Sequence, residues 1–297
     1  MVQRRVGEDN VNDKIKAVKT GGFLGFGKDF ESWEIKGLSG NDSLTGATKK
    51  DTLDGGSGID TLIGGKSDDL YFVDNPNDVI IEKSGSDVEG IDLVLSKAAK
   101  YVLPNNVENL TIEATNFFAV EGIGNSRSNI INGASSNDFL SGLGSNDTIN
   151  GFAGNDTLVG GDGRDSLFAG VGDDSLRGGT LSDYLEGSNG NDTLQGGETF
   201  GISRVDEFDT LSGGEGEDLF VLGIGNKSLY TSRGNRDFGT IKDFNSATDR
   251  LQVAGTRSEY SIQGSSLFYQ NDLIAVFEGL NQFQIGAILD SNTDFGE

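Results

Sequence analysis

The chain has no histidine and no cysteine among its 297 residues. The missing histidine excludes most zinc sites, histidine triads and histidine general bases. Without cysteine no disulfide can stabilise the fold, and the sequence does not indicate whether the protein works in an oxidising or a reducing compartment. Basic residues are scarce, 23 against 47 acidic ones, and the net charge of −24 argues against a nucleic-acid partner. A cation, by contrast, would relieve the self-repulsion of such a chain.

Long apolar runs are missing as well. No segment approaches the roughly 18 apolar residues of a membrane span. Residues 1–10 carry two arginines with no apolar segment behind them. The sequence therefore predicts no membrane span and no N-terminal secretory signal. Only 34% of the chain is apolar, whereas glycine reaches 46 residues, roughly twice ordinary usage.

Aspartate recurs at every ninth residue in two stretches, each time after a glycine-rich turn and two positions before an apolar residue. The first run is Asp42, Asp51, Asp60 and Asp69. The second run is Asp138, Asp147, Asp156, Asp165, Asp174, Asp183 and Asp192, continued after an insertion over 199–205 by Asp209 and Asp218. A fixed period indicates that one short unit is stacked repeatedly, with a carboxylate at the same place in each copy.

Residues 151–159 and 160–168 show the form of the unit, G-G-x-G-x-D-x-L-x. Glycines at positions 1, 2 and 4 permit positive φ, so the backbone turns tightly with its carbonyls pointing one way. The last three positions alternate apolar and polar residues, which favours a short strand. One apolar residue per unit makes a core only if the units stack inward from two opposing sheets. These position-8 residues are Leu140, Ile149, Leu158, Leu167, Leu176, Leu185, Leu194, Leu211 and Phe220.

Two units complete one coil in this all-β solenoid, so equivalent residues of successive coils lie about 4.8 Å from each other along the sheet. Asp147 then stacks on Asp165, and the carboxylates repel unless a cation lies between them. A lone Asp in a turn usually bonds its own backbone, but the period and the stacked partners favour a metal. Oxygen-only ligands with free carbonyls indicate a hard cation, and calcium fits better than magnesium.

These repeats resemble the hemolysin-type calcium-binding repeats of the RTX family, a right-handed parallel β-roll. The resemblance implies one calcium between turns that lie two units, or one coil, apart. The earlier turn supplies the carbonyls of positions 2 and 4 and its Asp, and the later turn supplies carbonyls 1 and 3 and its Asp. Carried over, one site uses Leu143, Ser145 and Asp147 with Gly160, Asp162 and Asp165, and the next uses Phe152, Gly154 and Asp156 with Ala169, Val171 and Asp174. Further turn glycines of such sites are Gly40, Gly55, Gly151, Gly161, Gly163, Gly170, Gly172, Gly178 and Gly187.

The stacked pairs predict about seven calcium ions, and up to nine if the pairs across the insertion are counted. One turn departs from the pattern. The turn before Asp51 has lost its position-4 glycine and carries Lys49 and Lys50, which weakens the Asp51/Asp69 pair. Because the insertion interrupts the period, the sequence does not decide whether Asp183 stacks on Asp209 and Asp192 on Asp218.

The sequence pattern divides the chain into five segments. Residues 1–35, with Phe23, Phe26, Phe30 and Trp33, are a predicted lead-in and cap. Residues 36–73 and 134–221 are the repeat blocks. Residues 74–133 resemble a spacer of RTX proteins and are interpreted as wider β-helical coils, the alternative being a separate small β domain. Residues 222–297 resemble a serralysin-like RTX cap, with antiparallel strands expected at 260–262, 266–269 and 273–277, and 282–297 is a candidate C-terminal export signal.

The resemblance favours a secreted, bacterial, extracellular protein exported by a type I secretion machinery, in which the calcium-stabilised roll itself has a structural, surface or adhesion role, self-association included. The alternative is a calcium-dependent extracellular enzyme of the glycosidase or lyase type, acting through carboxylates on the solenoid surface. No HExxH motif and no G-x-S-x-G motif occurs. Paired acids such as Glu215 and Glu217 are interpreted as solvated surface, so the sequence predicts that the protein is not an enzyme.

Overall fold

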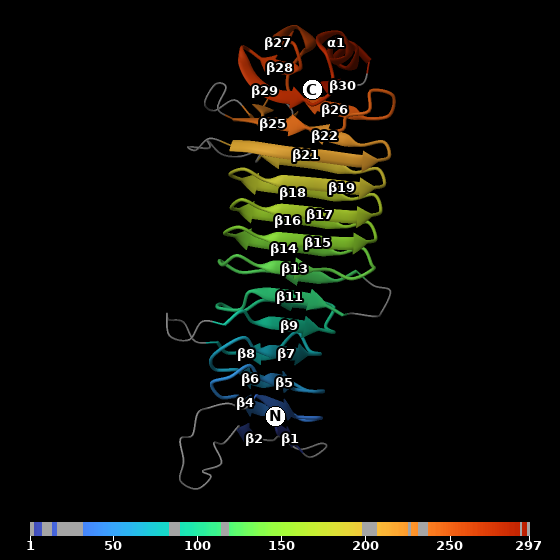
Figure 1. The fold of residues 1–297 in the computed structure, drawn as a ribbon. Coiled ribbons are helices and arrows are strands. Elements are labelled where there is room, and N and C mark those ends of the chain that lie inside the picture. The colour runs from blue at the N-terminus through green and yellow to red at the C-terminus, as the bar shows by residue number, and fades with distance from the viewer. Residues whose placement is uncertain are drawn as a thin grey trace. The chain divides into compact units, whose positions relative to one another are not determined.

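A computed structural model describes residues 3–7, 14–16, 32–82, 90–113, 119–197, 207–224, 227–230, 237–291 and 293–295. The chain forms two compact units, Met1–Ala134 and Ser135–Glu297, which are coloured blue to green and green to red in Figure 1. Phe23, Phe26 and Phe30, expected in the N-terminal cap, lie outside the described residues. In the described part, no helix is both long and apolar enough to cross a membrane.

The first unit is built from short parallel strands in three sheets. The longest sheet contains β1 (Gln3–Val6), β3 (Trp33–Lys36), β5 (Thr52–Asp54), β7 (Leu70–Val73), β9 (Leu93–Ser96), β11 (Asn109–Ile112) and β13 (Ile130–Asn132). The second contains β2 (Lys14–Lys16), β4 (Ser43–Thr45), β6 (Thr61–Ile63) and β8 (Val79–Ile80), and the third pairs β10 (Lys100–Val102) with β12 (Glu121–Ile123). From β3 onward, alternate residues of these strands point inward and are buried, as the period of two requires.

Coil length separates the repeats from the spacer in this unit. Within the repeats the partners are 18 residues apart, as in the hydrogen bond from Asp42 to Asp60, and this distance along the chain is one coil. In the spacer the shift is 23 residues from Asp69 to Asp92, 16 from Asp92 to Glu108, and 21 between Thr111 and Asn132. Two of these steps are wider than a repeat coil and one is narrower, so the spacer is not uniformly wide. The spacer strands pair in parallel with the repeats.

The second unit holds two facing sheets of longer strands, visible as stacked arrows in Figure 1. One contains β15 (Thr148–Ala153), β17 (Ser166–Val171), β19 (Tyr184–Asn189), β21 (Glu207–Glu215), β25 (Asp237–Ile241), β29 (Asp272–Phe277), β28 (Ser266–Tyr269) and β27 (Tyr260–Gln263). The other contains β14 (Phe139–Gly144), β16 (Thr157–Asp162), β18 (Ser175–Thr180), β20 (Thr193–Gly197), β22 (Leu219–Val221), β26 (Arg250–Val253) and β30 (Thr293–Phe295). A small ribbon pairs β23 (Gly223–Ile224) with β24 (Lys227–Ser228).

The core of this unit is the predicted apolar ladder. Ile149 pairs with Leu167 and Leu167 with Leu185, each one coil along. Every position-8 residue from Leu140 to Phe220 is at most 1% exposed. Across the insertion Leu185 pairs with Leu211, so the ladder continues. The prediction of an all-β parallel roll is confirmed.

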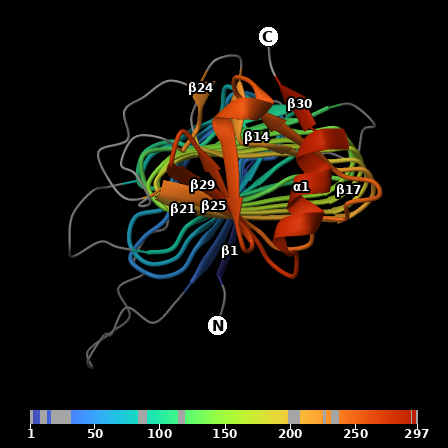
Figure 2. The ribbon, with the colours of Figure 1, turned by 90° about the horizontal axis from the view of Figure 1, so that it is seen from above.

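The C-terminal end of the second unit closes the roll with different elements. Strands β27, β28 and β29 are antiparallel, at the expected places. The 3-10 turn η1 (Arg257–Glu259) precedes these strands, and helix α1 (Gln282–Ser291) follows them. The helix contacts β26, β27 and β30, and Figure 2 shows it near β30. Its side chains Ile285, Ile288 and Leu289 are buried. Helix α1 therefore has a packing role, which the sequence did not indicate.

Candidate metal centre

The turns between strands hold their backbone in the left-handed region at positions 2 and 4. Gly161 and Gly163 have φ values of 116° and 149°, which glycine adopts without strain. Leu143, Ser145 and Phe152 stand at the same positions with φ values of 77°, 71° and 76°. A left-handed conformation costs such residues roughly 1–2 kcal/mol each, so the turn geometry is imposed even where glycine is absent.

That geometry directs the carbonyls of one turn at the next. A Cβ built on Gly161 would collide with the carbonyl oxygen of Leu143, and one on Gly163 with that of Ser145. The same relationship holds between Phe152 and Gly170 and between Gly154 and Gly172. The carbonyls of positions 2 and 4, which the resemblance implied as ligands, thus point toward the turn one coil later.

The aspartates at position 6 form two buried ladders along the turns. Each of the thirteen candidates, from Asp42 to Asp218, is at most 3% exposed. In the second unit, Oδ1 of Asp165 accepts the backbone N–H of Asp147 at 2.8 Å, and Oδ1 of Asp183 accepts that of Asp165 at 2.8 Å. One oxygen of each carboxylate therefore fixes the preceding turn. The period predicted the stacking but not this bond.

The second carboxylate oxygen is left over in most turns. Among the described residues, Oδ2 is buried without a hydrogen-bond partner in Asp60, Asp69, Asp156, Asp165, Asp174, Asp183, Asp192 and Asp218. A buried oxygen with no donor costs roughly 1–3 kcal/mol, and more when it is charged. Such a repeated deficit points to a partner that is not a side chain of this protein.

The leftover oxygen lies against the position-1 glycine of its turn, and the region around this contact is here called the turn gap. A Cβ built on Gly160, at position 1, would collide with Oδ2 of Asp165 and lie 2.6 Å from the carbonyl oxygen of Gly178. The gap is thus bounded by oxygens of two turns that lie one coil apart. A Cβ on Gly151 or Gly187 would likewise meet an Asp Oδ2 and a carbonyl oxygen of the next coil, and one on Gly55 or Gly178 would meet the Asp Oδ2 of its own turn. At the corresponding position before Asp174 stands Ala169, whose methyl group narrows the gap.

Burial shapes the electrostatics of these turns. It raises the pKa of Asp165 to about 6 and those of Asp156 and Asp192 to about 7. It raises the pKa of Asp183 to about 10, with the neighbouring Asp209 carboxylate adding to the shift. Ionised carboxylates at these positions need a positive charge beside them. The donor set is all oxygen, which fits a hard cation such as calcium.

The remaining predicted ligands occupy the same turns. Asp162 and Val171, at position 3, pair with Gly144 and Ala153 in the sheet ends. The Asp162 side chain is exposed and accepts a hydrogen bond from Thr180. Gly40 has φ of 125° at position 4 of the first turn.

Comparison with known families agrees with this geometry. The family model described as the RTX calcium-binding nonapeptide repeat (4 copies) matches residues 45–80, 123–151, 150–185, 177–198 and 206–235. The chain carries RTX calcium-binding nonapeptide repeats. Its repeats are therefore of the calcium-binding type. No curated protein matches the chain.

One RTX turn differs from the others. Both carboxylate oxygens of Asp51 are hydrogen-bonded, Oδ2 to the N–H of Ala47 and Oδ1 to that of Trp33, each at 2.7 Å. Ala47 and Lys49, at positions 2 and 4, are outside the left-handed region. This turn has closed on itself and offers no free Asp oxygen. Asp51 still lies against Asp69, whose Oδ1 accepts its N–H.

The RTX ladders continue across the insertion. Asp209 Oδ1 accepts the N–H of Asp183 at 2.9 Å, and Asp218 does the same for Asp192. At Asp209 the leftover oxygen is satisfied within the chain, because the buried Tyr230 hydroxyl donates to its Oδ2 at 2.7 Å. A Cβ on Gly196 would collide with both atoms. Tyr230 thus fills the turn gap of Asp209.

Several ladder members were missed by the sequence reasoning. Asp78 and Asp249 extend the ladders, accepting the N–H groups of Asp60 and Asp218 through Oδ1. Their Oδ2 atoms accept N–H groups of their own turns, including that of Asn245 for Asp249. Asp92 accepts the N–H of Asp69. The signal was available, because an apolar residue stands two positions after each of these aspartates.

In addition to the buried aspartate ladders, the side chains at position 5, one residue before each Asp, form an exposed ladder. Asn146 Oδ1 accepts the N–H of Arg164 at 2.9 Å, and Asn155 accepts that of Asp173 at 3.1 Å. Side chains at this position thus satisfy the donor of the turn one coil later. The frequent Asn at position 5 was the sequence signal for this ladder.

Proposed function

We propose that this protein is a calcium-loaded β-roll with a structural, surface or adhesion role outside the cell. The observation that supports it best is the row of buried Oδ2 atoms without a donor, which at Asp156, Asp165 and Asp192 lie close to a carbonyl oxygen of the next coil. A cation in each gap would supply the missing positive charge. Since the sites are formed by stacking, binding calcium and folding would be one process.

Paired turns would hold about seven to nine ions in total. The closed turn at Asp51 argues against the Asp51/Asp69 pair as an ordinary site, and the Tyr230 hydroxyl bonded to Asp209 argues in the same way against Asp183/Asp209. The hydrogen bond across the insertion and the unpartnered Oδ2 of Asp218 support Asp192/Asp218. Each ion adds two positive charges, so even about seven would remove more than half of the net charge of −24. The many acidic residues are then needed to balance the charge of the bound calcium ions.

An ion count tests this function directly. Calorimetric titration of calcium-free protein, together with metal analysis after gel filtration in calcium, should give about seven to nine ions per chain. A crystal grown in calcium should place them between turns that lie one coil apart. A count of two or fewer would contradict the stacking of sites, and a count of zero would remove the function altogether.

Export is the second part of the proposal. A chain that is cysteine-free, strongly acidic and dependent on calcium would stay unfolded at the low calcium of a bacterial cytosol. It would fold outside, which suits a one-step type I exporter. The segment 282–297 is the candidate signal. Its buried Ile285 and Leu289 mean that a deletion would also uncover the end of the roll, so native fractionation is the cleaner test. Protein found only in the cytosol would favour an intracellular calcium buffer.

We prefer a structural role over an enzymatic one because the paired exposed acids lie in a turn of the repeats. Glu215 and Glu217 are exposed in the turn before Asp218, where the backbone N–H of Glu217 is bonded to Asn191. These residues belong to the repeat geometry of the turn. Self-association or attachment to a surface would use the outward faces of the sheets.

A further inference from the structure

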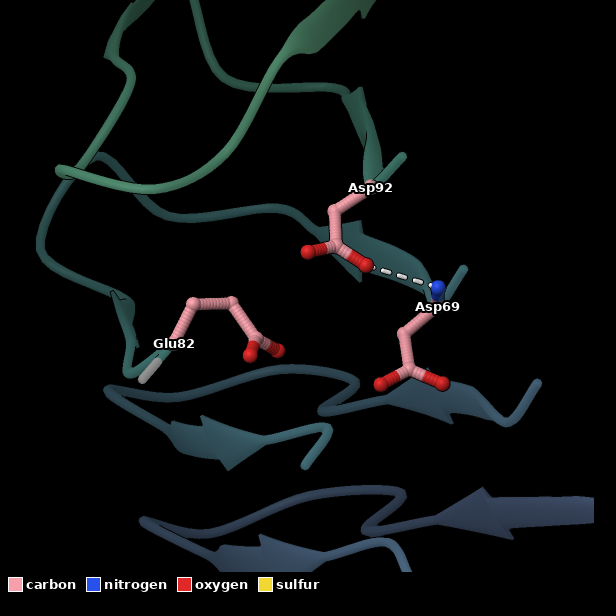
Figure 3. A group of neighbouring side chains, drawn as sticks. All are labelled: Asp69, Glu82 and Asp92. Carbon is pink, nitrogen blue, oxygen red and sulfur yellow. Dashed lines mark hydrogen bonds between the residues drawn. The ribbon is translucent and has the colours of Figure 1, made fainter. Parts of the chain in front are cut away.

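Three carboxylates from two successive coils meet at the end of the first repeat block. Asp69 precedes β7, Glu82 follows β8, and Asp92 precedes β9. One oxygen from each lies within 4.8 Å of the others. Figure 3 shows Asp92 beside Asp69, with the Glu82 side chain reaching toward both. Asp69 and Asp92 are 2% and 4% exposed, and Glu82 is partly buried.

The backbone fixes the two aspartates and leaves an oxygen over. Asp92 Oδ1 accepts the N–H of Asp69 at 2.7 Å, and the N–H of Asp92 is bonded to Glu108 at 3.0 Å. Asp69 Oδ2 is buried and has no hydrogen-bond partner among the described residues. In Figure 3 an oxygen of the Asp69 carboxylate points toward the Glu82 side chain. The cluster thus contains a buried acceptor with no donor.

The space between these oxygens is the turn gap of Asp69. A Cβ built on Gly64 would collide with Asp69 Oδ2 and with the Tyr71 hydroxyl, and would lie 2.6 Å from Glu82 Oε1. Glycine leaves this space open. Oxygens therefore converge on one point from three residues, more closely than any carbon atom could be accommodated.

A comparison with the filled gap at Asp209 shows that this one is different. There Tyr230 donates its proton to Asp209 and satisfies the leftover oxygen. Here Tyr71 donates to Glu82 instead, so the added side chain brings negative charge to Asp69 rather than a donor. Burial, followed by the neighbouring carboxylates, raises the pKa of Asp69 to about 9. Without a cation beside them, these neighbouring carboxyl groups cannot all be ionised at once.

We propose that Asp69, Glu82 and Asp92 hold one calcium ion in a side-chain site that is separate from the nonapeptide sites. The Glu82 carboxylate faces the gap beside Gly64, where the Gly178 carbonyl faces the corresponding gap beside Gly160. More ligand charge gives tighter calcium binding. This site therefore fills at lower calcium than the paired turns, and it fastens the coil between Asp69 and Asp92 where the regular period ends.

Glu82→Gln tests the site in the full-length protein. Glutamine keeps an oxygen for the Tyr71 hydroxyl but removes the charge. The expected result is one calcium fewer per chain, with loss of the tightest binding phase in the calorimetric titration. Glu113→Gln, an exposed glutamate in the same unit, is the matched control and should leave count and phases unchanged. An unaltered count in Glu82→Gln would overturn the proposal and indicate that the cluster shares a proton.

Terbium(III), used as a calcium probe, gives a second readout that does not depend on the total count. Tyr71 is hydrogen-bonded to Glu82, so excitation of tyrosine should sensitise terbium bound here. We expect emission at the lowest terbium concentrations to fall in both Glu82→Gln and Tyr71→Phe, while Tyr71→Phe keeps the calcium count. Equal emission from all three proteins would contradict the site. If wild-type protein keeps its other calcium ions, this failure leaves the nonapeptide sites standing.

Discussion

The backbone N–H of Asp156 donates a 2.6 Å hydrogen bond to Oδ1 of Asp174, 18 residues later. The Asp174 carboxylate therefore fixes a neighbouring turn with one oxygen and faces its turn gap with the other. Stacking and metal binding depend on one side chain. This coupling explains why a chain with 34% apolar residues is expected to be disordered without cation and regular with it.

Asp165→Ala should be worse than Asp51→Ala. Asp165 bonds the turn of Asp147 and has a free Oδ2, so it serves pairs on both sides. In Asp51 both carboxylate oxygens already accept hydrogen bonds from backbone N–H groups. We expect the calcium midpoint of folding to rise several-fold in Asp165→Ala and to move little in Asp51→Ala. Equal shifts in the two variants would count against the turn-gap model.

Position 1 offers a reciprocal pair of substitutions. Gly160→Ala places a methyl group in the turn gap of Asp165 and should weaken calcium binding. Ala169→Gly opens the gap of Asp174 and should strengthen it. Gly144→Ala is the control, because its new Cβ would meet nothing closer than 3.9 Å. Calcium midpoints by circular dichroism check all three, and a shift of the same sign in Gly160→Ala and Ala169→Gly would contradict the account.

The exposed ladder is expected to stabilise the roll modestly. Asn155→Ala removes the acceptor of the Asp173 N–H and should lower the free energy of unfolding by about 0.5–1.5 kcal/mol. Asn155→Asp keeps an acceptor oxygen and should retain most of that stability. Urea unfolding at fixed, saturating calcium measures both. Identical losses in the two variants would show that the hydrogen bond is not the cause.

Acid should favour folding when calcium is absent. Burial raises the folded-state pKa of Asp156 and Asp192 from 3.8 to about 7. The folded state then binds more protons, so its stability is greatest at low pH and falls as pH rises through about 7. Metal-free protein should show more β structure at about pH 5, above its pI of 4.2, than at about pH 8. More β structure at the higher pH would be the contrary result.

Much of the fold could be predicted from the sequence, because a constant period fixes the register. Once the coil length is constant, Ile149 must stack on Leu167 and Asp147 on Asp165. Where coil length changes, loops set the register, and the place of Asp92 could not be read from spacing. The contacts of Tyr230 and Glu82 were hidden for the same reason. Both reach a turn gap from a part of the chain that does not repeat.

Circular dichroism during a calcium titration of the full-length protein tests the central claim most directly. The account predicts a mostly disordered chain in chelator and a β-rich one in calcium. Ordering the chain costs roughly 1–2 kcal/mol per residue, and burying carboxylates without a cation adds to that cost. Half-saturation should fall on the order of 0.1–1 mM. Equal β content in chelator and in saturating calcium would contradict calcium-coupled folding of this roll.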